Sequence, residues 1–157
     1  AGPDGWGGKR LDRMIRELGI GERVVRPGFV DDEDLPAVYS LADALVFPSV
    51  AEGFGFPVLE AMACGTPVIA SDIPPLREVA GDAARLVRPG DLPAWRTALE
   101  ETLADADALR RLAEAGRRHA RQYTWAAHGT ALAELYRTVL AEDQASGGAL
   151  PDGEPST

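Results

Sequence analysis

The sequence is poor in cysteine, in lysine and in long apolar runs. Cys64 is the only cysteine among 157 residues, so no internal disulfide can form, and a reducing cytoplasm is the expected compartment. No apolar run approaches the roughly 20 residues that cross a bilayer. Lys9 is the only lysine, and the formal net charge is −9. Binding nucleic acid calls for a basic face, so we expect no nucleic-acid partner.

What is present is the pattern of an α/β domain. The length suits one domain with a sizeable core. Short apolar runs alternate with longer amphipathic segments, which predicts a parallel sheet with helices on both faces. Residues 143–157 have no periodicity and are predicted to be a disordered tail, so that 1–142 form the folded part. The predicted strands are 23–27, 44–47, 67–71 and 84–87, and the predicted helices are 8–18, 31–42, 57–64, 76–79, 91–103, 107–121 and 124–140. Side-chain caps are expected at the starts of three of these helices, from Asp31 or Asp32, from Asp91 and from Thr124.

One stretch, from Phe47 to Asp72, organises the rest. It reads as a strand, a glycine loop, a helix, a turn and a second strand. Gly53 and Gly55 in the loop let the backbone approach a ligand without a Cβ in the way. Pro57 suits the first turn of the helix, and Gly65 suits the residue after its last turn. The stretch therefore predicts one βαβ unit.

The positions of two acids indicate the chemistry of this unit. Free N–H groups at a helix start beside glycines form an anion site. Glu52 lies just before the glycine loop, and Glu60 lies about one helical turn inside the helix. Carboxylates do not belong on an anion site unless they serve hydroxyl groups at its edge. The pattern therefore indicates a ligand with phosphate in the middle and hydroxyl-rich groups at both ends, such as a nucleotide sugar.

The segment EGFGFPVLEAMACGTPVIAS closely resembles the signature of the retaining GT-B glycosyltransferases of family 4, in which seven residues separate two glutamates. RVVRPGFVDDEDLPAVYSLADALVFPS before it, and REVAGDAARLVRPGD and RQYTW after it, are similar to the same family. The resemblance covers about residues 2–140, and GPDGW near the start is most similar to bacterial mannosyl- and related hexosyltransferases. The ordered set of motifs is much more specific than a glycine loop alone.

The resemblance implies a role for each site residue. Glu60 would accept hydrogen bonds from the ribose hydroxyls, and Glu52 would be catalytic, beside the transferred sugar. The loop at Phe29 and Val30 would stack near the base, although Phe29 could also be a core residue. The donor-binding residues implied are Glu60, Gly53, Phe54, Gly55, Leu59, Phe29 and Val30. No metal and no cofactor are implied, and the substrate would be a donor such as a GDP- or UDP-hexose.

The resemblance also implies a larger protein. The donor-binding half of this family is a Rossmann-like domain with more strands than the four counted here, so the chain reads as a partial C-terminal domain whose first strands are missing. The acceptor, a glycan or lipid-linked glycan, would bind through a missing N-terminal domain. The expected function is retaining hexosyl transfer, in the cytoplasm or peripherally at the membrane. The isolated chain is expected to be inactive and to self-associate through exposed sheet edges.

Several alternatives compete with these interpretations. The chain could be a non-catalytic partner domain that completes its sheet with another chain. A nicotinamide dinucleotide fingerprint would need glycine where Val58 stands. Two acidic pairs have the Asp-x-Asp spacing of a metal site, but both lie at predicted helix starts, where acids favour the dipole; they are Asp32-Glu33-Asp34 and Asp105-Ala106-Asp107. His119 and His128 are predicted to be helix-surface residues without a metal or catalytic partner.

Overall fold

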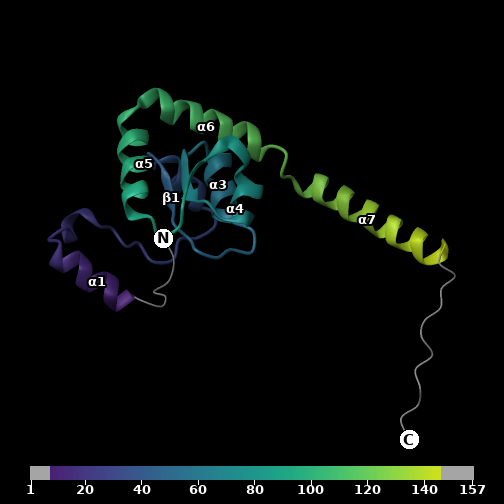
Figure 1. The fold of residues 1–157 in the computed structure, drawn as a ribbon, viewed down its shortest axis with the longest axis horizontal. Coiled ribbons are helices and arrows are strands. Elements are labelled where there is room, and N and C mark those ends of the chain that lie inside the picture. The colour runs from purple at the N-terminus through teal and green to yellow at the C-terminus, as the bar shows by residue number, and fades with distance from the viewer. Residues whose placement is uncertain (1–7, 146–157) are drawn as a thin grey trace, which may run out of the picture.

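The computed structural model of the protein describes residues 8–145, and side chains over 8–142. Three parallel strands form a sheet in the order β1-β2-β3, and helices cover both of its faces (Figure 1). The described residues thus form an α/β fold, and the predicted βαβ unit is confirmed. In chain order the elements are α1 (Gly8–Glu17), the 3₁₀ helix η1 (Gly21–Arg23), α2 (Leu35–Ser40), β1 (Leu45–Phe47), α3 (Phe56–Cys64), β2 (Val68–Ser71), α4 (Pro74–Ala80), η2 (Gly81–Ala83), β3 (Arg85–Val87), α5 (Leu92–Ala104), α6 (Ala106–Ala120) and α7 (Trp125–Ala145).

The central strand β2 is buried along its whole length. Val68 and Ala70 belong to the main core, with residues of α3, α4 and α6. Ile69, which points to the other face, packs with Trp95 and Ala98 of α5. A strand buried on both faces is predominantly apolar, and this explains the apolar run Val68, Ile69 and Ala70 that predicted it. The last residue of the strand, Ser71, is polar and also buried.

Helix α3 has the boundaries that its sequence predicts. Gly65 follows its last turn in the left-handed conformation, with φ +78°. The N–H of Gly65 donates to the Met62 carbonyl at 2.9 Å, and the N–H of Thr66 donates to the Ala61 carbonyl at 2.8 Å. These two bonds form a Schellman motif, which satisfies carbonyls that the helix end leaves free.

Helix α6 crosses close to α3 because its Gly116 has no side chain. A Cβ on Gly116 would lie 3.0 Å from Cγ of Met62. The same helix brings Arg117 to the end of α3, where its Nη2 donates to the Cys64 carbonyl at 3.1 Å. Because α6 packs this closely on α3, it holds α3, including the start of that helix, in a fixed place against the sheet.

His119 corrects the prediction of a helix-surface histidine. It is half-buried at the end of α6, and its Nε2 lies 2.8 Å from the Val79 carbonyl of α4. A carbonyl can only accept, so Nε2 carries the proton. Nδ1 lies 2.9 Å from Nε2 of Gln122. The histidine joins α6 to α4, a contact between residues 40 positions apart that helix periodicity does not indicate. His128, in contrast, is exposed on α7 as predicted.

The predicted strand over 23–27 is wrong. Gly21–Arg23 form a 3₁₀ turn, and Val24 is extended, with φ −111° and ψ 112°. A strand needs a neighbour to share its backbone hydrogen bonds. Within residues 8–145, β1 pairs with β2 and β2 with β3, and no strand runs beside this segment.

The predicted side-chain cap on the second helix is also wrong. α2 begins at Leu35, and its N-cap residue, Asp34, makes no capping bond with its side chain. Instead, the backbone carbonyl of Asp31 accepts the N–H groups of Asp34, at 2.9 Å, and Leu35, at 3.1 Å. The backbone carbonyl of Asp31 thus accepts N–H groups at the start of this helix, where the prediction expected the side chain of Asp31 or Asp32 to accept them.

Helix α7 leads away from the sheet and its covering helices (Figure 1). Thr124 caps it as predicted, with Oγ1 accepting the N–H of Ala127 at 3.1 Å. The helix reaches Ala145, so the start of the predicted disordered tail is helical, and 146–157 lie outside the described residues. Trp125 at its start is 85% exposed, and exposed apolar side chains continue along it at Leu132, Leu135, Tyr136, Val139 and Leu140.

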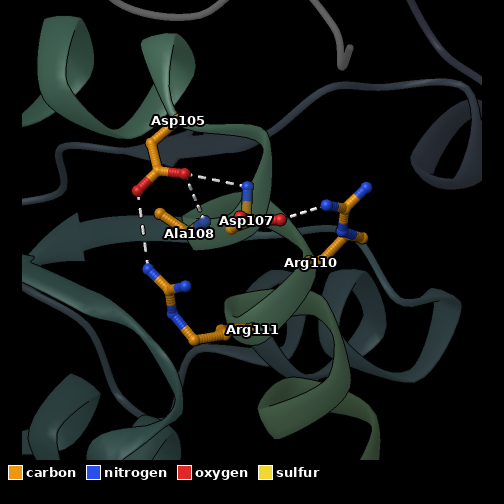
Figure 2. A network of polar contacts seen from close by, with 5 residues as sticks. All are labelled: Asp105, Asp107, Ala108, Arg110 and Arg111. Atoms are coloured by element: carbon orange, nitrogen blue, oxygen red, sulfur yellow. Dashed lines mark hydrogen bonds and ion pairs between the residues drawn. The ribbon is translucent and has the colours of Figure 1, made fainter.

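Asp105 caps α6, and the structure supports capping over metal binding for this acidic pair (Figure 2). Its Oδ1 accepts the N–H groups of Asp107, at 2.8 Å, and Ala108, at 3.0 Å, while Oδ2 lies 3.5 Å from Nη2 of Arg111. Asp107 pairs with Arg110. The Ala108 N–H, helped by the Asp107 N–H and by Arg111, lowers the pKa of the Asp105 carboxyl.

Replacing Asp105 with alanine is expected to lower the melting temperature at neutral pH, because two N–H groups of α6 lose their acceptor. The folded pKa of this carboxyl lies below its ordinary value of 3.8. Its contribution to stability is therefore complete above that value and is lost as the pH falls through the lower folded pKa. The difference in melting temperature between wild type and Asp105→Ala should thus shrink at acid pH.

The matched control is Asp34→Ala, because Asp34 is also an N-cap aspartate but its side chain makes no capping bond. It should change the melting temperature little at either pH. Thermal unfolding followed by circular dichroism, from neutral pH down to about pH 3, makes the comparison, in a range set by the carboxyl pKa. A loss for Asp105→Ala that stays constant over this range would contradict the assigned role of the carboxylate.

Candidate functional site

The glycine loop, residues 48–55, joins the carboxyl end of β1 to the start of α3. Ser49 Oγ donates to the Ala51 carbonyl at 3.0 Å and so folds the first part of the loop. In open α/β sheets, ligands bind at the carboxyl ends of the strands, and the start of a helix favours anions. The glycine loop and the start of α3 therefore lie at the carboxyl ends of the strands, where a ligand site is expected.

Several N–H groups at this junction have no acceptor in the described part of the chain. Val58 N–H donates to the Gly55 carbonyl at 3.0 Å, and Pro57 has no N–H. For the N–H groups of Phe54, Gly55 and Phe56, residues 8–145 supply no acceptor. Such groups are suited to bind oxygen atoms of a phosphate or a sugar.

The two loop glycines differ in whether the fold requires glycine at their positions. Gly55 takes φ +103°, and a Cβ there would lie 2.5 Å from Cδ2 of Leu76, a fully buried residue of α4. The fold therefore requires glycine at position 55. Gly53 has no positive φ, and a Cβ there would meet nothing within 4 Å. The fold does not require glycine at position 53.

The two glutamates flank this junction in different ways. Glu52 is half-buried in the loop, and within the described chain its carboxylate has no hydrogen bond or ion pair. Glu60 lies on α3, as predicted, but on its exposed side, while Val58, Leu59, Ala61 and Met62 around it are buried. The apolar neighbours that suggested a partly buried Glu60 instead turn into the core and leave its carboxylate at the surface.

Tyr39 is a site neighbour that the sequence did not reveal. Its hydroxyl donates to Oε2 of Glu60 at 2.9 Å. Burial of the ring, the hydrogen bond to Glu60 and the charge of that carboxylate, in this order, raise the pKa of Tyr39 above its ordinary range. In the sequence, Tyr39 is one of the apolar positions of a predicted helix. Its polar tip was the only available signal that it could serve more than the core.

Three other predicted donor-binding residues lie in two environments. Leu59 is a core residue, so its side chain packs inside the protein. Phe29 and Val30 lie in the loop before α2, where Phe29 is 72% exposed. The core alternative for Phe29 is therefore wrong, and its ring is free of the hydrophobic core.

Aromatic rings connect the glycine loop to the region between α6 and α7. The rings of Phe54 and Phe56 are 4.8 Å apart, and Phe54 lies 6.3 Å from Tyr123 in an edge-on arrangement. Tyr123 in turn donates to the Glu78 carbonyl of α4 at 3.3 Å. The contacts of Tyr123 with Phe54 and Glu78 join segments far apart in the sequence, so they could not be read from residue spacing.

Asp72 argues against the dinucleotide alternative. It follows β2, where the acid of a dinucleotide fingerprint would bind a ribose. Here Arg77 of α4 pairs with it: Nη2 donates to Oδ2 at 2.9 Å, and Nε donates to Oδ1. The hydrogen bond from Arg77 lowers the pKa of the Asp72 carboxyl. Its two oxygens are thus already engaged by a side chain of the protein.

Fold and site together define a Rossmann-like α/β domain with a glycine loop at a helix start. The family model described as "Glycosyl transferases group 1" matches residues 1–119. The chain is 42% identical over 127 residues to the O-antigen chain mannosyltransferase B of Escherichia coli, covering 80% of this chain. The protein belongs to the group 1 glycosyltransferase family.

Solved structures give the same picture. Sucrose-phosphate synthase from Thermosynechococcus elongatus matches with a TM-score of 0.80 at 35% identity, over 90% of this chain and 38% of that one. Anabaena HepE, in complex with UDP and glucose, matches with a TM-score of 0.78 at 26% identity, over 87% and 39%. The fold matches the C-terminal half of the GT-B glycosyltransferases. The chain spans 33% of the length of the Escherichia coli mannosyltransferase.

Two further properties concern residues 8–145 only. No group of three or more His, Cys, Asp and Glu side chains in this range could hold a metal ion. Across the same range, each helix is too short or too polar to cross a membrane.

Proposed function

We propose that the complete polypeptide containing this chain transfers a hexose from a nucleotide-sugar donor to a hydroxyl group, with retention of the anomeric configuration and without a metal. The donor is a GDP- or UDP-hexose, and the acceptor is a glycan or lipid-linked glycan bound by a part of the protein outside this chain. The observation that carries the proposal is the junction of glycine loop and α3, where free N–H groups lie between two glutamates. The UDP held by the structurally similar HepE supports the donor class.

Each part of the junction has a task in this proposal. The N–H groups of Phe54 and Gly55 bind the diphosphate or the sugar, and Gly53 lets the donor come close to the backbone. Glu60 accepts the ribose hydroxyls, and Glu52 stabilises the reacting sugar. Oriented N–H dipoles favour the charge that develops as the diphosphate leaves. Leu59 contributes by packing α3 against the core, and Phe29 and Val30 border the base.

The test of the proposed ribose contact is Glu60→Gln, which keeps the shape of the side chain but removes its charge. A charge-assisted hydrogen bond contributes roughly 1.5–3 kcal/mol. Donor affinity should therefore fall by about 10- to 100-fold. The measurement is calorimetric titration of the complete polypeptide with UDP-glucose and with GDP-mannose, so that the base preference is found in the same experiment.

The matched control is Glu114→Gln, because Glu114 is an exposed helix glutamate of α6 that pairs with Arg118. It should leave donor affinity unchanged. Wild-type affinity in Glu60→Gln would show that this carboxylate does not hold the ribose. A wild-type protein that binds neither donor would refute the proposed function as a whole.

A second candidate function rests on the edge of the sheet. β1 is an edge strand of the three-stranded sheet, and its Val46 is 41% exposed. Such an edge accepts a further strand from elsewhere. A non-catalytic domain that completes its sheet with another chain, or with a second copy of itself, would use this edge. Two results together would oppose this candidate: sedimentation that shows only monomers, and transfer activity that needs no partner chain.

A further inference from the structure

Tyr39 is held at three points, and this makes it an unusually fixed hydrogen-bond donor. Its ring packs against the main core. Its backbone carbonyl accepts a hydrogen bond from Oγ1 of Thr66 at 2.7 Å, and Thr66 is buried in the turn between α3 and β2. Its hydroxyl donates to Glu60 Oε2 at 2.9 Å. The phenol thus has little freedom to move relative to α3.

The contact restricts Glu60 more than it restricts Tyr39. Glu60 is exposed on α3, and an exposed glutamate normally samples many rotamers. The phenol holds Oε2 and leaves Oε1 without a partner in the described chain. A carboxylate can accept about four hydrogen bonds. One is taken by Tyr39, and the remaining positions suffice for two neighbouring hydroxyl groups of a ligand.

The phenol also stays a donor over the whole physiological range. Burial and the Glu60 carboxylate both raise the pKa of Tyr39. A group that never ionises there always presents its O–H to Oε2. The orientation of Glu60 therefore does not change through ionisation of the phenol in this pH range.

We propose that Tyr39 is a positioning residue, which holds the Glu60 carboxylate in the orientation that receives both hydroxyls of a ribose and so favours ribonucleotide donors. This inference rests on the proposed function, because it takes Glu60 as the ribose acceptor. Tyr39 does not touch the substrate; it acts through Glu60. Fixed supporting groups of this kind keep a binding group within the narrow range of geometry that a site requires.

A purely structural role for Tyr39 makes a different prediction. If the hydrogen bond only joined α2 to α3, its loss would lower thermal stability and would weaken all ligands by the same factor. A positioning role weakens only those ligands that use the ribose hydroxyls. The ratio of two affinities measured on one protein sample separates these roles, because a loss of folded protein affects both affinities equally.

The experiment compares UDP with 2′,3′-dideoxy-UDP, and GDP with its dideoxy form, by calorimetry on the complete polypeptide. The variants are Tyr39→Phe, Glu60→Gln and the double mutant. Tyr39→Phe removes one oxygen and keeps the ring. Tyr136→Phe is the matched control, since Tyr136 is exposed on α7 and its hydroxyl has no partner in the described residues. Melting temperatures are measured for all proteins.

Tyr39→Phe should reduce the preference for the ribo form by about 3- to 10-fold, a part of what one charge-assisted hydrogen bond provides. Its affinity for the dideoxy form should stay that of wild type. The double mutant should lose no more preference than Glu60→Gln alone, because Tyr39 acts through that carboxylate. Tyr136→Phe should change nothing.

Two results would overturn the inference. One is an unchanged preference in Tyr39→Phe while Glu60→Gln loses it, which would leave the proposed function intact. The other is additive losses in the double mutant, which would mean that Tyr39 does not act through Glu60. A wild type without any preference for the ribo form would instead refute the ribose role of Glu60 itself. If Tyr39→Phe is too unstable to titrate under these conditions, the same ratio is measured for all variants at a lower temperature, where Tyr39→Phe is folded.

Discussion

Replacing Gly55 with alanine should destabilise the protein by roughly 2–5 kcal/mol, the sum of a strained positive φ and of overpacking. The new Cβ would lie 2.5 Å from Cδ2 of Leu76. Leu76 is fully buried among residues of the main core and cannot move aside freely. Folded proteins are stable by only about 5–15 kcal/mol, so this single methyl group is expected to remove a large part of the total.

Gly53→Ala is the control, since it adds the same methyl group two residues earlier, where nothing lies within 4 Å. It should leave the free energy of unfolding almost unchanged. Under the proposed function it should nevertheless weaken UDP-glucose or GDP-mannose binding, because a Cβ would stand where the donor approaches. Urea unfolding and calorimetric titration of both variants provide the measurements. Equal stability losses in the two variants would contradict the structural distinction between these glycines.

Replacing Glu52 with glutamine should reduce the rate of hexosyl transfer by about 100-fold or more, the effect expected when an electrostatic group at a reacting centre is removed. Donor affinity should change by no more than about 3-fold, because Glu52 acts mainly in the transition state. Glu60→Gln should show the opposite profile. The measurements are steady-state transfer rates and donor titrations on the complete polypeptide.

Glu22→Gln serves as the control for Glu52→Gln, because Glu22 is an exposed glutamate of η1 whose carboxylate makes no hydrogen bond or ion pair in the described residues. It should transfer at the wild-type rate. If Glu52→Gln and Glu60→Gln lost turnover and donor affinity in the same proportion, the division of tasks between the two carboxylates would be refuted, although donor binding at the junction would not.

Local features of this fold could be predicted because they depend on residues within a few positions of one another. The end of α3 at Gly65 needs only one glycine in the left-handed conformation after an apolar helix. The caps at Asp91 and Thr124 are bonds between residues three positions apart. The buried strand β2 is apolar at successive positions because both of its faces are covered.

Predictions failed where the outcome depended on a neighbour distant in sequence. The segment 23–27 has the composition of a strand, but a strand exists only beside a partner, and residues 8–145 supply none. His119 has the periodicity of a surface position, but α4 brings the Val79 carbonyl to it. The composition of a segment indicates which structure it can adopt, while its packing against other elements decides which structure and burial it has.

The candidate site shows the same division. The sequence by itself determined the βαβ unit, the glycine loop at a helix start and the placement of two glutamates around it, because these follow from local conformational preferences. Only the tertiary structure separated Gly55 from Gly53, through the Leu76 side chain, and joined Tyr39 to Glu60 across 21 positions. Those contacts come from α4 and α2 packing against α3, and such packing depends on the whole core rather than on any local pattern.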